Sequence, residues 1–94
     1  MDWPPGWSAI IKSEVRAAIA RELESELGEG HVLKGAACMP IARAEGSDDI
    51  LFQLDDGRVA EVHLTFAGRP ERPPWPGTAI FDDLNAWAKA VEEQ

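Results

Sequence analysis

The sequence predicts a small α+β domain with the element order α-β-β-β-α, in which a three-stranded antiparallel meander carries both helices on one face. Three observations lead to this prediction. Apolar residues recur at helical spacing near both ends of the chain, they alternate with polar residues in the centre, and an Asp-Gly turn separates the two central runs. The 94 residues have an ordinary globular composition and fit one domain, 1–94.

The first helix is expected over about 8–27, with Ser8 as its N-cap and Gly28 directly after its end. The preceding residues, 1–7, are expected to form an irregular arm, because two prolines and a glycine there oppose helix formation. The apolar residues of the helix repeat every four positions and form one broad stripe: Ile11, Val15, Ile19, Leu23 and Leu27.

The first strand is expected over about 37–45, after a glycine-containing loop. Pro40 lies inside this strand and lacks a backbone N–H, which indicates either an edge strand or a β-bulge. The second and third strands lie within 49–66, where apolar residues alternate in two runs: Ile50, Phe52 and Leu54, then Ala60, Val62, Leu64 and Phe66.

Two registers compete for the hairpin between these runs. A two-residue turn places Phe52 opposite Glu61, whereas a three-residue loop, 55–57, with Gly57 in a left-handed conformation places Phe52 opposite Ala60. We prefer the second register because it gathers the alternating apolar residues on one face. The opposite, more polar face then holds Leu51, Gln53, Val59, Glu61, His63 and Thr65.

The C-terminal third of the chain is expected to contain a proline-rich loop and a helix. Residues 67–77 hold four prolines in eleven positions, which predicts an extended, irregular loop. The last helix is expected over about 82–92, with Asp82 as its N-cap. Its buried stripe consists of Leu84, Trp87, Ala88 and Val91.

Composition restricts the classes of partner. A net charge of −8 disfavours nucleic acid, because phosphate binding needs clustered Lys and Arg, and it favours a basic protein partner. No segment approaches the ~20 apolar residues of a membrane span, so no membrane association is expected. The N-terminus has no secretory signal pattern, and Cys38 is the only cysteine, so a reducing cytoplasmic location is expected.

Four residues are candidate binding residues: Glu61, His63, Thr65 and Trp75. Glu61 and Thr65 flank His63 on the polar sheet face, and a carboxylate beside an imidazole can orient a general base. The alternative is a surface histidine in a cross-strand hydrogen bond. Trp75 is a candidate anchor, because tryptophan is enriched at binding hot spots, unless it merely covers the edge of the core.

No catalytic, metal or cofactor site is expected. The nitrogen and sulfur ligands Cys38, His31 and His63 lack the paired spacing of zinc sites, and the spaced glycines match no phosphate loop. Three aspartate pairs lack EF-hand spacing and suit turns and N-caps: Asp48-Asp49, Asp55-Asp56 and Asp82-Asp83.

One part of the sequence resembles a group of proteins. It combines an Asp-Asp-Ile-Leu-Phe strand at 48–52, a Val-His-Leu-Thr-Phe strand at 62–66 and a Pro-Trp-Pro loop at 74–76. These segments resemble a group of short bacterial proteins of unknown function with an "HLT" strand followed by a proline-tryptophan loop. The resemblance covers about residues 45–90 and implies a bacterial single-domain protein, with no activity, cofactor or site residue attached.

The first functional hypothesis is therefore a non-enzymatic protein-interaction domain that binds a basic partner, in the manner of an immunity protein or antitoxin. The charge and the missing catalytic constellation support it. One alternative is a self-associating structural domain, which would form a homodimer. The other is a small-ligand binder or minor enzyme that uses His63.

Overall fold

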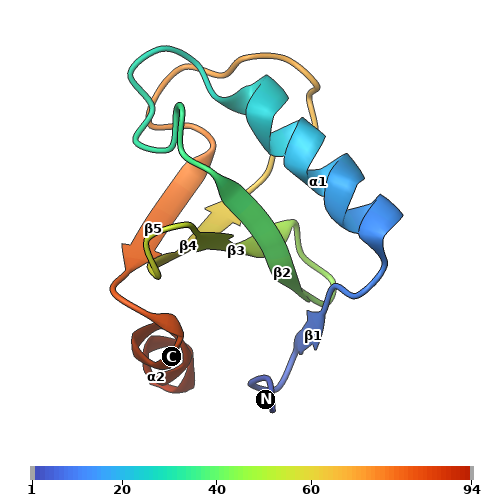
Figure 1. The fold of residues 1–94 in the computed structure, drawn as a ribbon, viewed down its shortest axis with the longest axis vertical. Coiled ribbons are helices and arrows are strands. Elements are labelled where there is room, and N and C mark those ends of the chain that lie inside the picture. Colours follow the sequence, from blue (N-terminus) through green and yellow to red (C-terminus); the bar gives the residue numbers. More distant parts are fainter. Residues whose placement is uncertain (1, 94) are drawn as a thin grey trace.

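The computed structural model describes residues 2–93, which form two helices and one five-stranded antiparallel sheet (Figure 1). The strands lie in the sheet in the order β1-β2-β3-β4-β5, so each strand pairs with the next one in the chain. The elements are β1 (Trp7–Ala9), α1 (Ser13–Glu26), β2 (Cys38–Ala44), β3 (Asp49–Leu54), β4 (Val59–His63), β5 (Gly77–Phe81) and α2 (Leu84–Glu92).

The predicted three-stranded meander is wrong, because the sheet has an additional strand at each edge. β1 pairs with β2, with Trp7 opposite Ala44, and β5 pairs with β4, with Ala79 opposite Glu61. The N-cap predicted at Ser8 therefore lies inside β1, and α1 begins five residues later at Ser13. Ile11, which was expected in the helical stripe, precedes the helix and is 81% exposed.

The central hairpin has the predicted register. Phe52 lies opposite Ala60, and Gly57 has a φ of 94°, the left-handed conformation expected for the last residue of the three-residue loop. The Gly57 N–H donates to the Leu54 carbonyl at 3.2 Å, and the Leu54 N–H donates to the Arg58 carbonyl at 2.9 Å. The bulge alternative at Pro40 is also confirmed, because the β2–β3 register shifts between Pro40 and Ala42.

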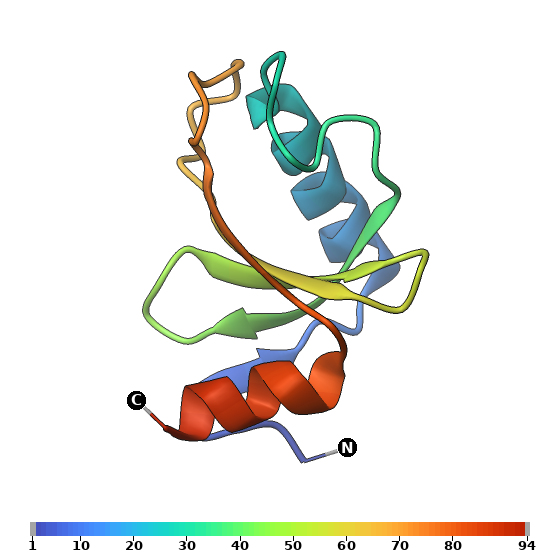
Figure 2. The same ribbon diagram turned by 90° about the vertical axis from the view of Figure 1, so that its left-hand side faces the viewer.

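The two helices lie on opposite faces of the sheet, so the prediction that both cover one face is wrong (Figures 1 and 2). On the first face, α1 lies closest to β2 and shares a buried core with β3 and β4, which includes Ile19, Leu23, Leu27, Ile50, Phe52 and Val62. On the second face, α2 packs against the apolar residues of the predicted polar face, through Trp87, Leu84, Leu51 and Val59. Leu51 and Val59 are fully buried, and a helix on this face is what excludes water from them.

The N-terminal arm is attached to α2 by its tryptophans. The Trp87 ring is fully buried, and the rings of Trp3 and Trp7 meet it edge-on at centroid distances of 5.9 Å and 4.9 Å. The arm predicted over 1–7 therefore closes the second core and leads into β1. Met1 lies outside the described residues. Among the residues described, neither helix has the length and apolar character needed to cross a lipid bilayer.

Candidate functional site

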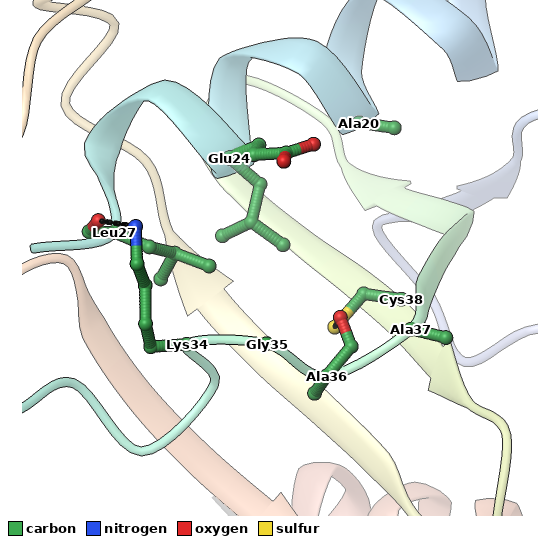
Figure 3. A pocket seen from close by; sticks show the side chains of 9 residues that line it. Ala20, Glu24, Leu27, Lys34, Gly35, Ala36, Ala37 and Cys38 are labelled. Atoms are coloured by element: carbon green, nitrogen blue, oxygen red, sulfur yellow. Dashed lines mark hydrogen bonds between the residues drawn. The ribbon is translucent and has the colours of Figure 1, made fainter.

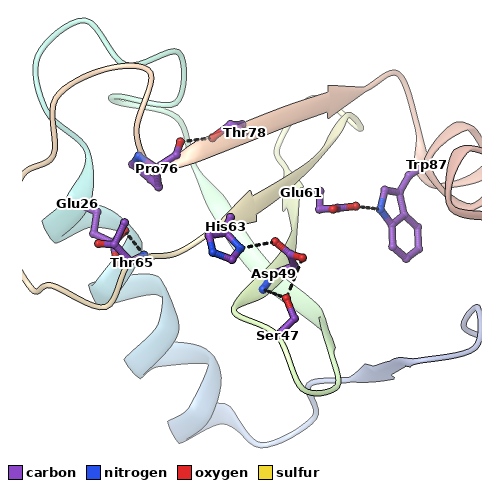
Figure 4. A network of polar contacts seen from close by, with 9 residues as sticks. All are labelled: Glu26, Ser47, Asp49, Glu61, His63, Thr65, Pro76, Thr78 and Trp87. Atoms are coloured by element: carbon purple, nitrogen blue, oxygen red, sulfur yellow. Dashed lines mark hydrogen bonds and ion pairs between the residues drawn. The ribbon is translucent and has the colours of Figure 1, made fainter. Parts of the chain in front are cut away.

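The second face of the sheet carries a polar cluster where α2 does not cover it. His63 ends β4 and lies opposite Asp49, the first residue of β3. The ring Nδ1 of His63 is 2.8 Å from Asp49 Oδ1 (Figure 4). The other Asp49 oxygen accepts a 2.8 Å hydrogen bond from the Ser47 hydroxyl. Together with Glu61, which is two residues before His63 on the same face, these residues form what we call the His63 cluster: Ser47, Asp49, Glu61 and His63.

The His63 ring is held by a carboxylate and faces solvent. Its side chain is 55% exposed, and within residues 2–93 nothing bonds Nε2. A carboxylate at Nδ1 with Nε2 exposed is an arrangement that general bases use. However, the Ser47 hydroxyl donates to Asp49 instead of lying against Nε2, and Cys38 pairs with Leu54 at the opposite end of β3. The cluster therefore suits polar recognition better than nucleophilic catalysis.

Glu61 joins this exposed cluster to the second core. Its Oε1 accepts a 2.8 Å hydrogen bond from the indole Nε1–H of Trp87, a side chain with no exposed surface (Figure 4). Glu61 itself is half-buried, and its other carboxylate oxygen has no bonding partner in the part of the chain that the structure describes. One oxygen thus satisfies a buried donor, and the other remains available on the surface.

Trp75 lies at the His63 end of the same face. Gly77 is opposite His63 in the register, so a Cβ on Gly77 would point to the face that carries His63. Such a Cβ would be 3.5 Å from the ring carbon Cζ3 of Trp75. The Trp75 ring therefore occupies the space that a side chain at Gly77 would fill, and 54% of Trp75 is exposed.

Thr65 does not belong to the His63 cluster, although it was predicted on the same face. β4 ends at His63, and the chain then turns toward the end of α1. The Thr65 N–H donates to Glu26 Oε1 at 2.8 Å, and its hydroxyl donates to Glu71 at 3.1 Å. The structure therefore brings together three of the four predicted residues, Glu61, His63 and Trp75, and places the fourth in a loop anchored on α1.

Glu26 is a buried carboxylate that sequence reasoning missed. It has no exposed surface, and it accepts backbone hydrogen bonds from Thr65 at 2.8 Å and from Phe66 at 3.0 Å. Burial raises the pKa of this carboxyl, and a side-chain hydrogen bond with Glu22 raises it further, against the lowering effect of the two backbone donors. Glu26 fixes the loop after β4 to α1, so its role is structural.

His31 is a second buried polar residue that sequence reasoning assigned no role. Its Nδ1 accepts a 3.0 Å hydrogen bond from the Leu33 N–H, so Nε2 carries the proton and donates to the Pro76 carbonyl at 3.0 Å. This neutral form ties the loop after α1 to the residue preceding β5. Both ring nitrogens are used by the fold.

One cavity of about 450 Å³ lies between the C-terminal half of α1 and residues 34–38 (Figure 3). Cys38 lines it, and burial together with the nearby Asp55 charge raises the pKa of its thiol, which keeps it in the weakly nucleophilic protonated form. The ammonium group of Lys34 donates to the Leu27 carbonyl at 3.1 Å, so the cationic group of this cavity is held by the fold. The cavity contains no activated nucleophile.

Two segments of the chain carry the net negative charge. The segments 45–63 and 77–93, which contain β3, β4, β5 and α2, hold ten Asp and Glu residues and only two Lys and Arg residues. The rest of the chain holds seven of each sign. These two segments therefore carry the whole net charge of −8, and one of their two cations, Arg58, is paired with Asp56 at 2.8 Å.

The comparisons with known proteins add no assignment. No family model, curated protein or solved structure matches the chain. The resemblance to short bacterial proteins with an "HLT" strand therefore stays a prediction. Over residues 2–93, no group of three or more His, Cys, Asp and Glu side chains is arranged to hold a metal ion.

Proposed function

We propose that this protein is a non-enzymatic interaction domain that binds a basic segment of a partner protein. The proposed surface is the exposed part of the second sheet face, and it consists of Asp49, Glu61, His63 and Trp75. The single observation that supports this proposal most directly is the charge distribution, because the segments 45–63 and 77–93, which contain β3, β4, β5 and α2, carry the entire net charge of −8.

A net negative charge has physical consequences for binding. It attracts a cationic partner from a distance, which raises the association rate. The exposed Trp75 ring adds an apolar surface on which a Lys or Arg side chain can lie in a cation–π contact. Charge provides the attraction in this proposal, and the Trp75 ring provides the short-range contact.

The biological role that we propose within this class is neutralisation of a basic protein, as an immunity protein or antitoxin does. A small acidic domain can cover the cationic active or nucleic-acid-binding surface of such a partner. This role requires no catalytic group in the domain itself, which agrees with a His63 ring that has no nucleophile beside it.

The test uses a fluorescent lysine-rich peptide as a defined probe and measures its affinity at low and high salt. The first variant, Asp49→Asn with Glu61→Gln, removes two charges from the proposed surface and keeps both side-chain shapes. Its matched control, Glu14→Gln with Glu24→Gln, removes two charges from α1. We expect salt-sensitive binding by the wild type, several-fold weaker binding by the first variant and unchanged binding by the control.

Two results would contradict the proposed function. Absence of peptide binding at low salt would remove the basic-partner hypothesis. Equal weakening in both variants would show that only the net charge matters and that no particular surface is used. If the expected pattern is found, affinity capture from a native lysate with the wild type and the same two variants identifies the natural partner.

A further inference from the structure

The outer edge of β5 is open along its length. β5 is the last strand of the sheet, and among residues 2–93 it pairs with β4 alone. Figure 2 views the molecule from the side of this strand, and no other segment of the ribbon passes in front of it. Open strand edges are templates for pairing with another chain.

The alternation of backbone hydrogen bonds along the strands shows which backbone N–H and C=O groups of β5 face outward. The N–H groups of Leu54 and Leu64 bond the carbonyls of Arg58 and Asp48, so the even-numbered residues of β4 bond β3. In an antiparallel sheet the alternate residues bond the opposite neighbour, so the odd-numbered residues of β4 bond β5. Their register partners are the odd-numbered residues Gly77, Ala79 and Phe81.

The even-numbered residues of β5, Thr78 and Ile80, therefore direct their backbone N–H and C=O groups away from the sheet. Within residues 2–93, no hydrogen bond reaches any of these four backbone groups. They form two complete donor–acceptor pairs at the spacing that an added antiparallel strand requires.

The sequence of β5 does not protect this edge. Gly-Thr-Ala-Ile-Phe contains no lysine, no proline and no charged side chain, which are the usual means of preventing edge pairing. The opposite edge of the sheet is shorter, because β1 has only three residues and β5 has five. β5 therefore offers the longer edge for an added strand.

Two features beside the edge indicate what kind of segment it accepts. Ala79, which is small and exposed, lies opposite Glu61 on the same face, between Glu61 and the open edge. Neighbouring strands are about 4.8 Å apart, so a lysine or arginine opposite Ala79 can extend across it toward Glu61. Asp82, which is exposed directly after β5, adds a second carboxylate.

The other feature is an apolar cavity of about 430 Å³ at the start of β5. Its lining includes Thr78 and the exposed side chain of Val32, and the remaining wall is formed by Gly30, His31, Pro73 and Pro74. A strand that pairs with Thr78 would place one end beside this cavity, where an apolar side chain can enter. Edge pairing with pockets for individual side chains is a known mode of peptide recognition.

We propose that β5 is the docking edge, and that an extended basic segment of the partner adds to the sheet as a sixth, antiparallel strand. This inference rests on the proposed function, and it specifies the geometry of the partner. The occupant is a foreign basic segment and not a second copy of this chain. Two copies joined at β5 would bring together two chains that each carry a net charge of −8.

The first test uses peptides of alternating threonine and lysine in which selected backbone nitrogens are methylated. One peptide carries the methyl groups on the backbone nitrogens of its threonines, and the other carries them on the backbone nitrogens of its lysines. The side chains of Thr78 and Ile80 lie on the α1 side of the sheet. In an antiparallel pair, the peptide residues that bond Thr78 and Ile80 have their side chains on this same side. Threonines in these positions leave the lysines on the side of Glu61. Methylation of the threonine backbone nitrogens therefore removes the N–H groups that would bond β5. Methylation of the lysine backbone nitrogens leaves those N–H groups in place.

We expect the lysine-methylated peptide to bind as the unmodified peptide does, and the threonine-methylated peptide to bind about tenfold more weakly or worse. The charges and length of the two methylated peptides are identical, so electrostatic attraction alone predicts equal affinities. This comparison uses the wild-type protein and does not depend on the folding of any variant.

The second test changes the protein at the edge. Thr78→Pro removes one outward N–H, and proline is tolerated where a strand N–H faces solvent. The control, Thr78→Val, removes the hydroxyl and keeps the N–H. We expect the proline variant to lose binding of the unmodified peptide and the valine variant to keep it, with circular dichroism confirming that both are folded.

The outcomes separate the two proposals. If the unmodified peptide binds with salt sensitivity but the two methylated peptides bind equally, strand addition is overturned and the acidic-surface proposal stands. If the unmodified peptide does not bind, both are overturned. If light scattering shows that the free protein is a dimer and the Thr78→Pro variant is a monomer, the occupant of the edge is a second copy, and the proposed basic segment is wrong.

Discussion

The indole N–H of Trp87 donates a 2.8 Å hydrogen bond to a carboxylate oxygen of Glu61. This bond links the centre of the second core to the polar surface beside it, because Trp87 has no exposed surface and Glu61 is half-buried. Glu61 therefore has two separable properties. It is a hydrogen-bond acceptor for the fold, and it is a negative charge on the surface that we propose for binding.

Replacing Glu61 in two ways separates these properties. Glu61→Leu leaves the buried Trp87 N–H without an acceptor, which we expect to lower the free energy of unfolding by roughly 1–3 kcal/mol. Glu61→Gln keeps an acceptor oxygen and should cost less than about 1 kcal/mol. Urea denaturation of both variants measures the difference. Equal stability of the two variants would show that the Trp87 hydrogen bond contributes nothing to the fold.

The buried carboxyl of Glu26 makes stability depend on pH. Its pKa is raised by burial, and further by its hydrogen bond with Glu22, above the ordinary value of 4.5, so the folded chain holds this proton more tightly than the unfolded chain. A group of this kind stabilises the fold fully below its unfolded-state pKa, and the contribution is lost as pH rises through the raised value.

We therefore expect the wild type to lose stability relative to Glu26→Gln as pH rises upward from 4.5. The glutamine cannot ionise, so it removes this titration and keeps a side chain of similar shape. Urea unfolding of both proteins over a series of pH values gives the difference in the free energy of unfolding. A difference that changes in the opposite direction would mean that the backbone donors of Thr65 and Phe66 dominate and lower the pKa.

The hairpin of β3 and β4 could be predicted from the sequence because its signals are local. Alternating apolar residues fix the faces, and Gly57 provides the left-handed residue that the three-residue loop requires. The same register places Asp49 opposite His63, so the carboxylate partner of His63 follows from residues 49–63 alone. Sequence reasoning considered Glu61 as that partner and missed Asp49, the residue directly across the strand pair.

The edge strands could not be predicted in the same way. β1 has three residues, and its partner Ala44 is 37 positions away from Trp7, so neither its length nor local spacing identifies it. β5 follows a proline-rich loop and lacks the alternation of polar and apolar residues that marks a half-buried strand. Pairing with β2 and β4 determines both strands, which is tertiary context and not local propensity.

The sequence does contain a signal for the position of α2. The face assumed to be polar contains Leu51 and Val59, and exposing both to solvent is unfavourable. Trp87 and Leu84 on the last helix supply the apolar surface that covers them. Glu26 and His31 gave no comparable signal, because their partners are backbone groups of distant loops.

A substitution at Gly57 in the hairpin loop tests the cost of backbone strain alone, because an added Cβ there makes no packing contact. Gly57 has a φ of 94°, and a Cβ added there would meet no atom within 4 Å. Gly57→Ala should therefore cost about 1–2 kcal/mol through left-handed strain alone. Gly57→Asn should cost clearly less, because asparagine adopts this conformation more readily. Thermal unfolding compares the two variants, and equal losses would indicate an effect other than backbone conformation.

The junction between α1 and the proline-rich loop depends on a different property of glycine. Gly28 has no left-handed φ, but a Cβ added there would be 2.5 Å from the Glu71 carbonyl oxygen. The same segment is tied down by the Glu71 N–H, which donates to the Glu26 carbonyl at 2.9 Å. Gly28→Ala must therefore displace the backbone of Glu71 and lengthen this hydrogen bond.

We expect Gly28→Ala to destabilise the fold by roughly 1–3 kcal/mol and to accelerate amide hydrogen exchange at Glu71. The matched control is Gly35→Ala, where a Cβ has open space but φ is 83°, so the strain is local and the proline-rich loop is not displaced. Exchange at Glu71 should remain slow in the control. If both variants accelerate exchange at Glu71 to the same extent, general destabilisation explains the effect. Contact between Gly28 and Glu71 would then have no specific part in holding the loop on α1.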